Sequence, residues 1–262
     1  MARTSAGAQL TAEFGRRMNR LNRSTLRDMT ELWGLWRVGE WESFTQFATA
    51  AATLARARYG EAADLAVDYY RAFRLAEGAS GIATPRRGSA PTRAELVGKL
   101  EAASLSKTVE ALRAGQSPQA ARQAGLTRAS GVMTRESIAG ANDALLESAK
   151  ADPEAGARSP GRGGKWQRVT NSGDPCAFCA MLAGRGPVYS EETADFEAHW
   201  HCNCTAEVAY PGTGLPEQAK EYDRIYKRAV DSARASGELE RKTSNDLLNA
   251  FRREYERGTA AP

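Results

Sequence analysis

All four cysteines and both histidines of this 262-residue chain lie in one stretch, between Cys176 and Cys204. The stretch opens with a C-x-x-C pair, Cys176 and Cys179, and closes with a C-x-C pair, Cys202 and Cys204. Zinc in structural sites takes four nitrogen or sulfur ligands in a tetrahedron, and ligands paired on turns supply them at little entropic cost of loop closure. The spacing therefore predicts a structural metal site, with zinc as the metal.

The C-x-C pair is tighter than the spacing usual in zinc knuckles, so both of its sulfurs need not reach one metal. His199 and His201, just before that pair, are alternative ligands. Three other interpretations stay open: one or two disulfides, buried free thiols that pack as small apolar groups, and a catalytic centre. The candidate metal ligands are Cys176, Cys179, His199, Cys202 and Cys204.

A catalytic centre here would need a thiol nucleophile, or a metal-bound water with a histidine as base, as in a metal-dependent nuclease. Each histidine lies within a few residues of several potential ligands, which is more typical of a ligand cluster than of one nucleophile aimed at one base. No carboxylate motif accompanies the cluster. The pattern therefore favours binding over enzymatic activity, and it predicts no catalytic residue.

The net charge and hydropathy of the chain constrain the class of protein less than the cysteine pattern does. A net charge of +4 and an isoelectric point near 8.9 permit contact with nucleic acid or an acidic surface but do not argue for either. No run approaches the roughly 18 to 20 apolar residues of a membrane span, and residues 1–20 lack the apolar core of a signal peptide. We expect a protein made in a cytoplasm, where thiols stay reduced, with no membrane partner.

Residues 10–36 form the clearest amphipathic segment. At roughly 100° per residue, its apolar side chains fall within about 100° of arc on one side of a helix, and they are Leu10, Phe14, Met18, Leu21, Met29, Leu32 and Trp36. The opposite side carries Arg16, Arg20, Arg23 and Arg27. The pattern predicts a core-facing helix with a solvated basic face, or a basic stripe that docks on an acidic partner or on nucleic acid.

Further helices are predicted along most of the chain. Thr92 and Glu95 have the spacing of a capping box at the start of a helix to about residue 114, and Ser117-Pro118 starts another short helix. Two short strands are expected at residues 166–170 and 205–210. The other expected elements are helices over residues 41–77, 134–150, 216–235 and 244–257, and a loop over 77–91.

The predicted fold class is mainly α, in four parts. A helical N-terminal part is followed by a linker rich in Gly and Pro, a small irregular α+β module that carries the cysteines and histidines, and C-terminal helices. The parts cover residues 1–150, 151–165, 166–210 and 211–262.

The order of residues in the cysteine-bearing stretch resembles the MuF-like minor capsid proteins of tailed bacteriophages. The resemblance rests on the C-x-x-C pair, Leu182 and Gly184, and a His-x-x-Cys-x-Cys string that begins at His199. Trp200 and His201 stand where the family usually has Pro and Asn, so His199 ranks above His201 as a functional residue. The flanks at residues 164–169 and 185–189 are similar to the version found in phages of actinobacteria.

The resemblance implies a low-copy component of the phage head. Such a protein is made in the host cytoplasm, lies beside the portal protein in the capsid interior of the virion, and contributes to head assembly or DNA delivery. Its expected partners are the portal protein and the capsid interior, with packaged DNA as a further candidate. Some similar proteins are labelled capsid maturation proteases, so a protease, or a DNA-binding or nuclease module, is the alternative function.

Overall fold

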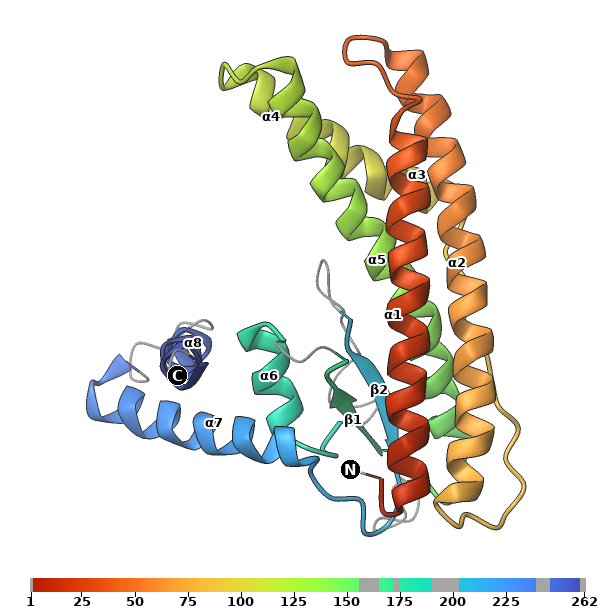
Figure 1. The fold of residues 1–262 in the computed structure, drawn as a ribbon, viewed down its shortest axis with the longest axis vertical. Helices are drawn as coiled ribbons and strands as arrows, with labels where there is room; N and C mark the ends of the chain where they lie inside the picture. Colours follow the sequence, from red (N-terminus) through yellow and green to blue (C-terminus); the bar gives the residue numbers. More distant parts are fainter. Residues whose placement is uncertain (1, 156–164, 172–174, 190–202, 239–245, 260–262) are drawn as a thin grey trace.

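A computed structural model describes residues 2–155, 165–171, 175–189, 203–238 and 246–259 of the chain (Figure 1). Long helices run side by side to form what we call the helical arm, residues 5–151. At its base lies the cysteine module, residues 165–210, and beyond it the C-terminal helices. The predicted mainly α fold class is confirmed. Within these ranges, none of the helices combines the length and the hydropathy of a membrane-spanning segment.

The first helix of the arm, α1 (Ser5–Trp33), follows the predicted amphipathic pattern. Thr4 caps it, because its Oγ1 accepts a hydrogen bond from the Gly7 N–H at 2.9 Å. The apolar stripe is buried as predicted at Phe14, Met18, Leu21 and Met29. The helix starts five residues earlier than expected and ends at Trp33.

Two further long helices, α2 (Trp41–Ala76) and α5 (Pro118–Ala151), pack along α1. Small residues let α2 and α5 approach closely: a Cβ on Gly140 would collide with the backbone of Tyr59. The prediction of two separate helices after residue 117 was wrong, since α5 is continuous. Ser117 and Pro118 do start it as predicted, with Ser117 Oγ accepting from the Ala120 N–H at 3.2 Å.

Three short elements pack at the far end of the arm. They are α3 (Arg93–Leu100), a π-helical turn η1 (Glu101–Leu105) and α4 (Ser106–Arg113). The capping box of Thr92 and Glu95 is confirmed. These elements help to cover an apolar cluster that contains Trp33, Trp36, Phe44 and Phe47. Trp41, the first residue of α2, lies at the surface and is 60% exposed.

The cysteine module contains an antiparallel pair of strands, β1 (Lys165–Val169) and β2 (Thr205–Ala209), close to their predicted positions. Lys165 pairs with Ala209, and Val169 pairs with Thr205. A short helix, α6 (Ala177–Gly184), follows β1 in the chain. After this helix, Tyr189 pairs with Trp166 of β1 in an isolated antiparallel β-bridge. Both strands pack against α5, so the module shares one apolar core with the base of the arm.

The C-terminal helices are α7 (Glu217–Ala235) and α8 (Asp246–Thr259), near their predicted bounds. They pack on each other and on α6 around Tyr222, Ile225 and Phe251. This third apolar cluster attaches the C-terminal helices to the cysteine module. The four-part division of the chain stays a prediction.

Candidate functional site: the cysteine module and its junction with the arm

The C-x-x-C pair lies at the start of α6, a helix that the sequence did not predict. Cys176 is the N-cap residue, and its Sγ accepts a hydrogen bond from the Cys179 N–H at 3.5 Å. Cys176 is exposed, whereas Cys179 is buried one turn later. The apolar run Ala177–Gly184, followed by Gly186 with a φ of 72°, is the signal that could have identified this helix.

Cys204 lies directly before β2 and is 3% exposed. It belongs to the same apolar cluster as Cys179, together with Trp166 and Tyr189. Asn142 on α5 binds the backbone on both sides of Thr205, the first residue of β2. Its Nδ2 donates to the Cys204 carbonyl at 3.5 Å, and its Oδ1 accepts from the Ala206 N–H at 2.8 Å.

Three of the five predicted ligands, Cys176, Cys179 and Cys204, can thus be placed in the module. The other two, His199 and Cys202, lie outside the described residues, as does His201. Among the residues that the structure does describe, no three Cys, His, Asp or Glu side chains are grouped as a metal site requires. The metal site therefore stays a prediction that depends on the stretch between Tyr189 and Asn203.

A guanidinium group lies beside one of the placed cysteines. Arg168 of β1 donates from Nη1 to the Sγ of Cys179 at 3.9 Å, and both side chains are buried. Metals bind the charged form of a cysteine sulfur, and a neighbouring cation stabilises that form. This contact is compatible with ligation by Cys179.

The C-terminal helices contact both ends of α6, the helix that begins at the C-x-x-C pair. Tyr255 of α8 donates a hydrogen bond from its hydroxyl to the carbonyl of Pro175 at 2.8 Å. Gly184, at the end of α6, lies against the backbone of α7, where a Cβ would come within 2.9 Å of the Tyr222 carbonyl carbon. Glycine is needed here because of this close approach.

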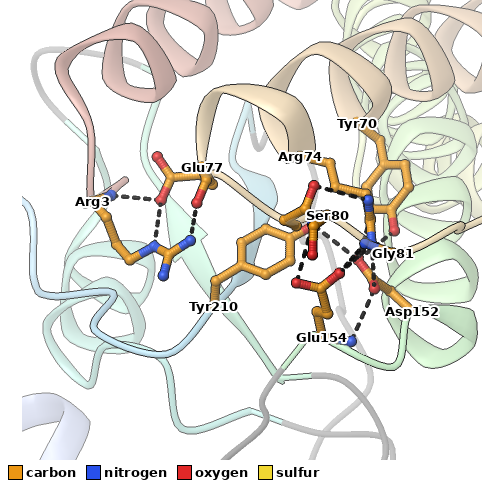
Figure 2. A network of polar contacts seen from close by, with 10 residues as sticks. Arg3, Tyr70, Arg74, Glu77, Ser80, Gly81, Asp152, Glu154 and Tyr210 are labelled. Atoms are coloured by element: carbon orange, nitrogen blue, oxygen red, sulfur yellow. Dashed lines mark hydrogen bonds and ion pairs between the residues drawn. The ribbon is translucent and has the colours of Figure 1, made fainter.

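The junction between the module and the arm is polar and buried, and Figure 2 shows its contacts. Asp152, just after α5, accepts hydrogen bonds from Arg74 Nε at 3.0 Å and from the hydroxyls of Tyr70 and Tyr210 at 2.8 and 3.0 Å. Burial acts to raise the pKa of Asp152, but Arg74, the Glu154 N–H and the two hydroxyls outweigh it and hold that pKa below its usual range. One carboxylate thus joins α2, α5 and the end of β2.

A second ion pair ties the start of the chain to the same junction (Figure 2). Arg3 Nε lies 3.3 Å from Glu77 Oε2, and the Arg3 backbone N–H donates to the same oxygen at 2.7 Å. Arg3 Nη1 donates to the Pro211 carbonyl at 2.9 Å. The Arg3 guanidinium also lies 5.8 Å from the ring centre of Tyr210. Sequence reasoning missed Asn142 and Asp152, because the partners that define their roles are distant in the sequence.

The four predicted partner-binding arginines lie on the exposed face of α1. Glu13 forms ion pairs with Arg16 at 2.8 Å and with Arg20 at 3.6 Å. Arg27 lies 3.5 Å from Asp28, while Arg23 forms no ion pair within the described residues. The face is exposed, which fits both interpretations of the sequence pattern, and its carboxylates offset part of its positive charge.

Comparison with known proteins identifies the group to which the chain belongs. A sequence model of the family described as VG15 protein matches residues 5–229. The chain is also 25% identical to the Gene 15 protein of Mycobacterium phage D29, in an alignment that covers 78% of this chain and 82% of that protein. No solved structure matches the chain significantly. Since the family match extends over most of the chain, from α1 into α7, this bacteriophage protein belongs to the VG15 protein family.

Proposed function

We propose that this phage protein is a MuF-like minor capsid protein that lies in the capsid interior beside the portal and acts by binding. The observation that carries the proposal is the firm attachment of a long helical arm to a small cysteine-bearing module, through Asp152 and Asn142. Such an arm presents a long solvated surface to a larger assembly while the module keeps its position. Membership of a phage protein family supports the setting.

In this proposal, structural zinc stabilises the module through Cys176, Cys179, Cys202 and either Cys204 or His199. The support is the placement of the first pair at the α6 N-terminus and of Cys204 in the same apolar cluster as Cys179. A module this small buries little apolar surface by itself, so a bound metal would add to its stability. Zinc would act there as a cross-link, with no part in chemistry.

Metal analysis of the purified full chain tests the zinc proposal. We expect about one zinc per chain, and loss of that zinc in Cys176→Ser and Cys202→Ser. Ser24→Ala is the control, since its hydroxyl bonds only its own helix at the Leu21 carbonyl. A chain that binds no zinc when purified under reducing conditions, or a Cys202→Ser variant that keeps its zinc, would contradict the ligand set.

We also propose that Arg16, Arg20, Arg23 and Arg27 form the surface of α1 that docks on an acidic part of the head. A matched pair of variants tests this. Arg16 and Arg20 flank Glu13 at 2.8 and 3.6 Å, and Arg224 and Arg228 of α7 flank Glu221 at 2.6 and 3.7 Å. Reversal of Arg16 and Arg20 to Glu should release the protein from the head, and reversal of Arg224 and Arg228 should not.

The proposed location of the protein is tested in intact virions, and its proposed lack of hydrolytic activity is tested with the purified protein. Cross-linking of intact virions should connect α1 to the portal protein. Incubation of the purified protein with capsid precursor and scaffold should yield no new fragments. Specific cleavage that disappears when one Ser, Cys or His is changed would promote the maturation protease to the first hypothesis. A DNA affinity with steep salt dependence would instead favour a nucleic-acid-binding module.

A further inference from the structure

The buried face of α1 includes an asparagine, Asn22, that is only 3% exposed. A buried amide is costly unless it forms hydrogen bonds. Asn22 Nδ2 donates to Oδ1 of Asn203 at 2.6 Å, whereas its own Oδ1 accepts no hydrogen bond within the described residues. Asn203 is the residue between the two cysteines of the C-x-C pair. One side chain of the arm thus reaches the centre of that pair.

A second asparagine holds the same residue from the end of β1. Asn171 Nδ2 donates to the Asn203 carbonyl at 2.7 Å and also lies 3.1 Å from Thr205 Oγ1. Asn19 of α1 in turn donates to the Asn171 carbonyl at 2.9 Å. Gly15 makes room for this arrangement, because a Cβ there would come within 2.6 Å of Asn171 Oδ1. The arm and the end of β1 therefore hold Asn203 jointly.

These side-chain contacts begin where the pairing of the strands ends. The last pair of the β1–β2 register joins Val169 to Thr205, and Asn203 and Cys204 come before it. Asn142 of α5 binds the Cys204 carbonyl from the other side. Asparagines from α1, from α5 and from the end of β1 thus bind the chain around the C-x-C pair in place of a strand ladder.

We propose that Asn22 and Asn171 are positioning residues, which hold the C-x-C pair, through Asn203, in the conformation in which the cysteine module takes up its metal. This inference rests on the proposed zinc site, of which neither side chain is a ligand. Groups that orient metal ligands from outside the coordination sphere commonly change metal affinity by about 10- to 100-fold. Because Asn22 belongs to α1, the metal affinity of the module then depends on the arm.

Competition with a chelating dye measures the zinc affinity of the full, reduced chain. Asn22→Leu and Asn171→Leu each remove the amide at nearly the same side-chain size. Both variants should still bind one zinc per chain, but about tenfold more weakly than the wild type. Thr25→Val is the matched control, since Thr25 is also buried on α1 and its hydroxyl donates within the helix, to the Leu21 carbonyl at 2.9 Å. Its zinc affinity should equal that of the wild type.

A double variant separates positioning from a general loss of stability. Asn203→Ala removes the acceptor of the bond from Asn22 and should also weaken zinc binding. In the Asn203→Ala background, Asn22→Leu should have no further effect, because the bond that it breaks is already absent. Losses of zinc affinity that add up in the double variant would mean that Asn22 acts in another way, and would overturn the assignment.

A readout without metal distinguishes this inference from the zinc proposal. Cys204 is 3% exposed, so its thiol should react slowly with a maleimide in the reduced, zinc-free wild type. Peptide mass spectrometry should show faster labelling in Asn22→Leu and Asn203→Ala, and no change in Thr25→Val. A wild type without zinc would contradict the zinc proposal, while faster labelling in these variants would still support positioning of the pair. Equal labelling of Cys204 in all of these proteins would overturn it.

Discussion

Both ends of the helical arm have an apolar cluster, and at the base a network of buried polar contacts lies beside that cluster. At the far end, Trp33, Trp36, Phe44 and Phe47 pack edge to face in an apolar cluster. At the base, the arm and the module also share an apolar cluster, and a buried carboxylate, Asp152, adds hydrogen bonds from Arg74, Tyr70 and Tyr210. Apolar packing tolerates many arrangements, whereas a buried ion pair is stable in few. The base is thus where the sequence specifies one orientation of the module.

The largest effect is expected at the far end. Phe47 is fully buried, and Phe47→Ala should lower the free energy of unfolding by about 3 to 5 kcal/mol, because it removes apolar contacts and leaves a cavity. Urea unfolding measures this loss. Trp41→Ala is the matched aromatic control: its side chain is 60% exposed, so a change within about 0.5 kcal/mol is expected. Equal losses in the two variants would break the comparison.

Asp152→Asn should come next, with a loss of about 2 kcal/mol from weaker hydrogen bonds to Arg74 and the two tyrosines. The loss should also appear as faster hydrogen exchange in β2, which the far-end variant should leave unchanged. Urea unfolding together with exchange mass spectrometry separates the two responses. Uniform exchange across the whole chain would mean that the base does not specifically orient the module.

The charges at the base should make its stability depend on pH in two opposite ways, with smaller effects. Burial raises the pKa of Glu207 on β2, so its contribution is present below the unfolded pKa and is lost as pH rises through the folded pKa. The pKa of Asp152 is lowered, so its contribution is present above the unfolded pKa and is lost as pH falls through the folded pKa. Urea unfolding of Glu207→Gln between about pH 2 and 9 should lack the loss of stability on raising the pH and keep the loss on lowering it.

The smallest loss of stability is expected for the capping box at the far end of the arm. Thr92→Ala removes the capping box of α3 and should cost about 1 kcal/mol in urea unfolding. Thr45→Ala, an exposed threonine inside α2, should cost less than about 0.5 kcal/mol. If Thr92→Ala lowered the free energy of unfolding as much as Phe47→Ala does, polar contacts would be as important at the far end as at the base.

The sequence predicted the elements whose core face consists of large side chains. Phe14, Met18 and Met29 recur at helical spacing, and α1 was predicted from them. The first half of α5 was not recognised as continuous with the second, because its buried positions include Ala121, Gly125 and Ala129, and such small residues give a weak periodic signal.

The candidate site was predictable only in its residue types. The cysteines were located by spacing, but the helix that carries Cys179 was missed because Cys176 is not among the usual N-cap residues. Asp152, Asn142 and Glu207 gave no signal, since each is defined by partners far away in the chain. Buried polar contacts between distant segments follow from the tertiary fold and cannot be read from local pattern.

The continuity of α5 has a mechanical consequence. Its 34 residues extend about 50 Å at 1.5 Å per residue. Near one end Asn142 binds the backbone at the start of β2, and near the other Arg122 donates to the Trp33 carbonyl at 2.7 Å. An unbroken helix is stiffer than two helices joined by a loop. We therefore expect a displacement of the tip of the arm to move the backbone beside Cys204.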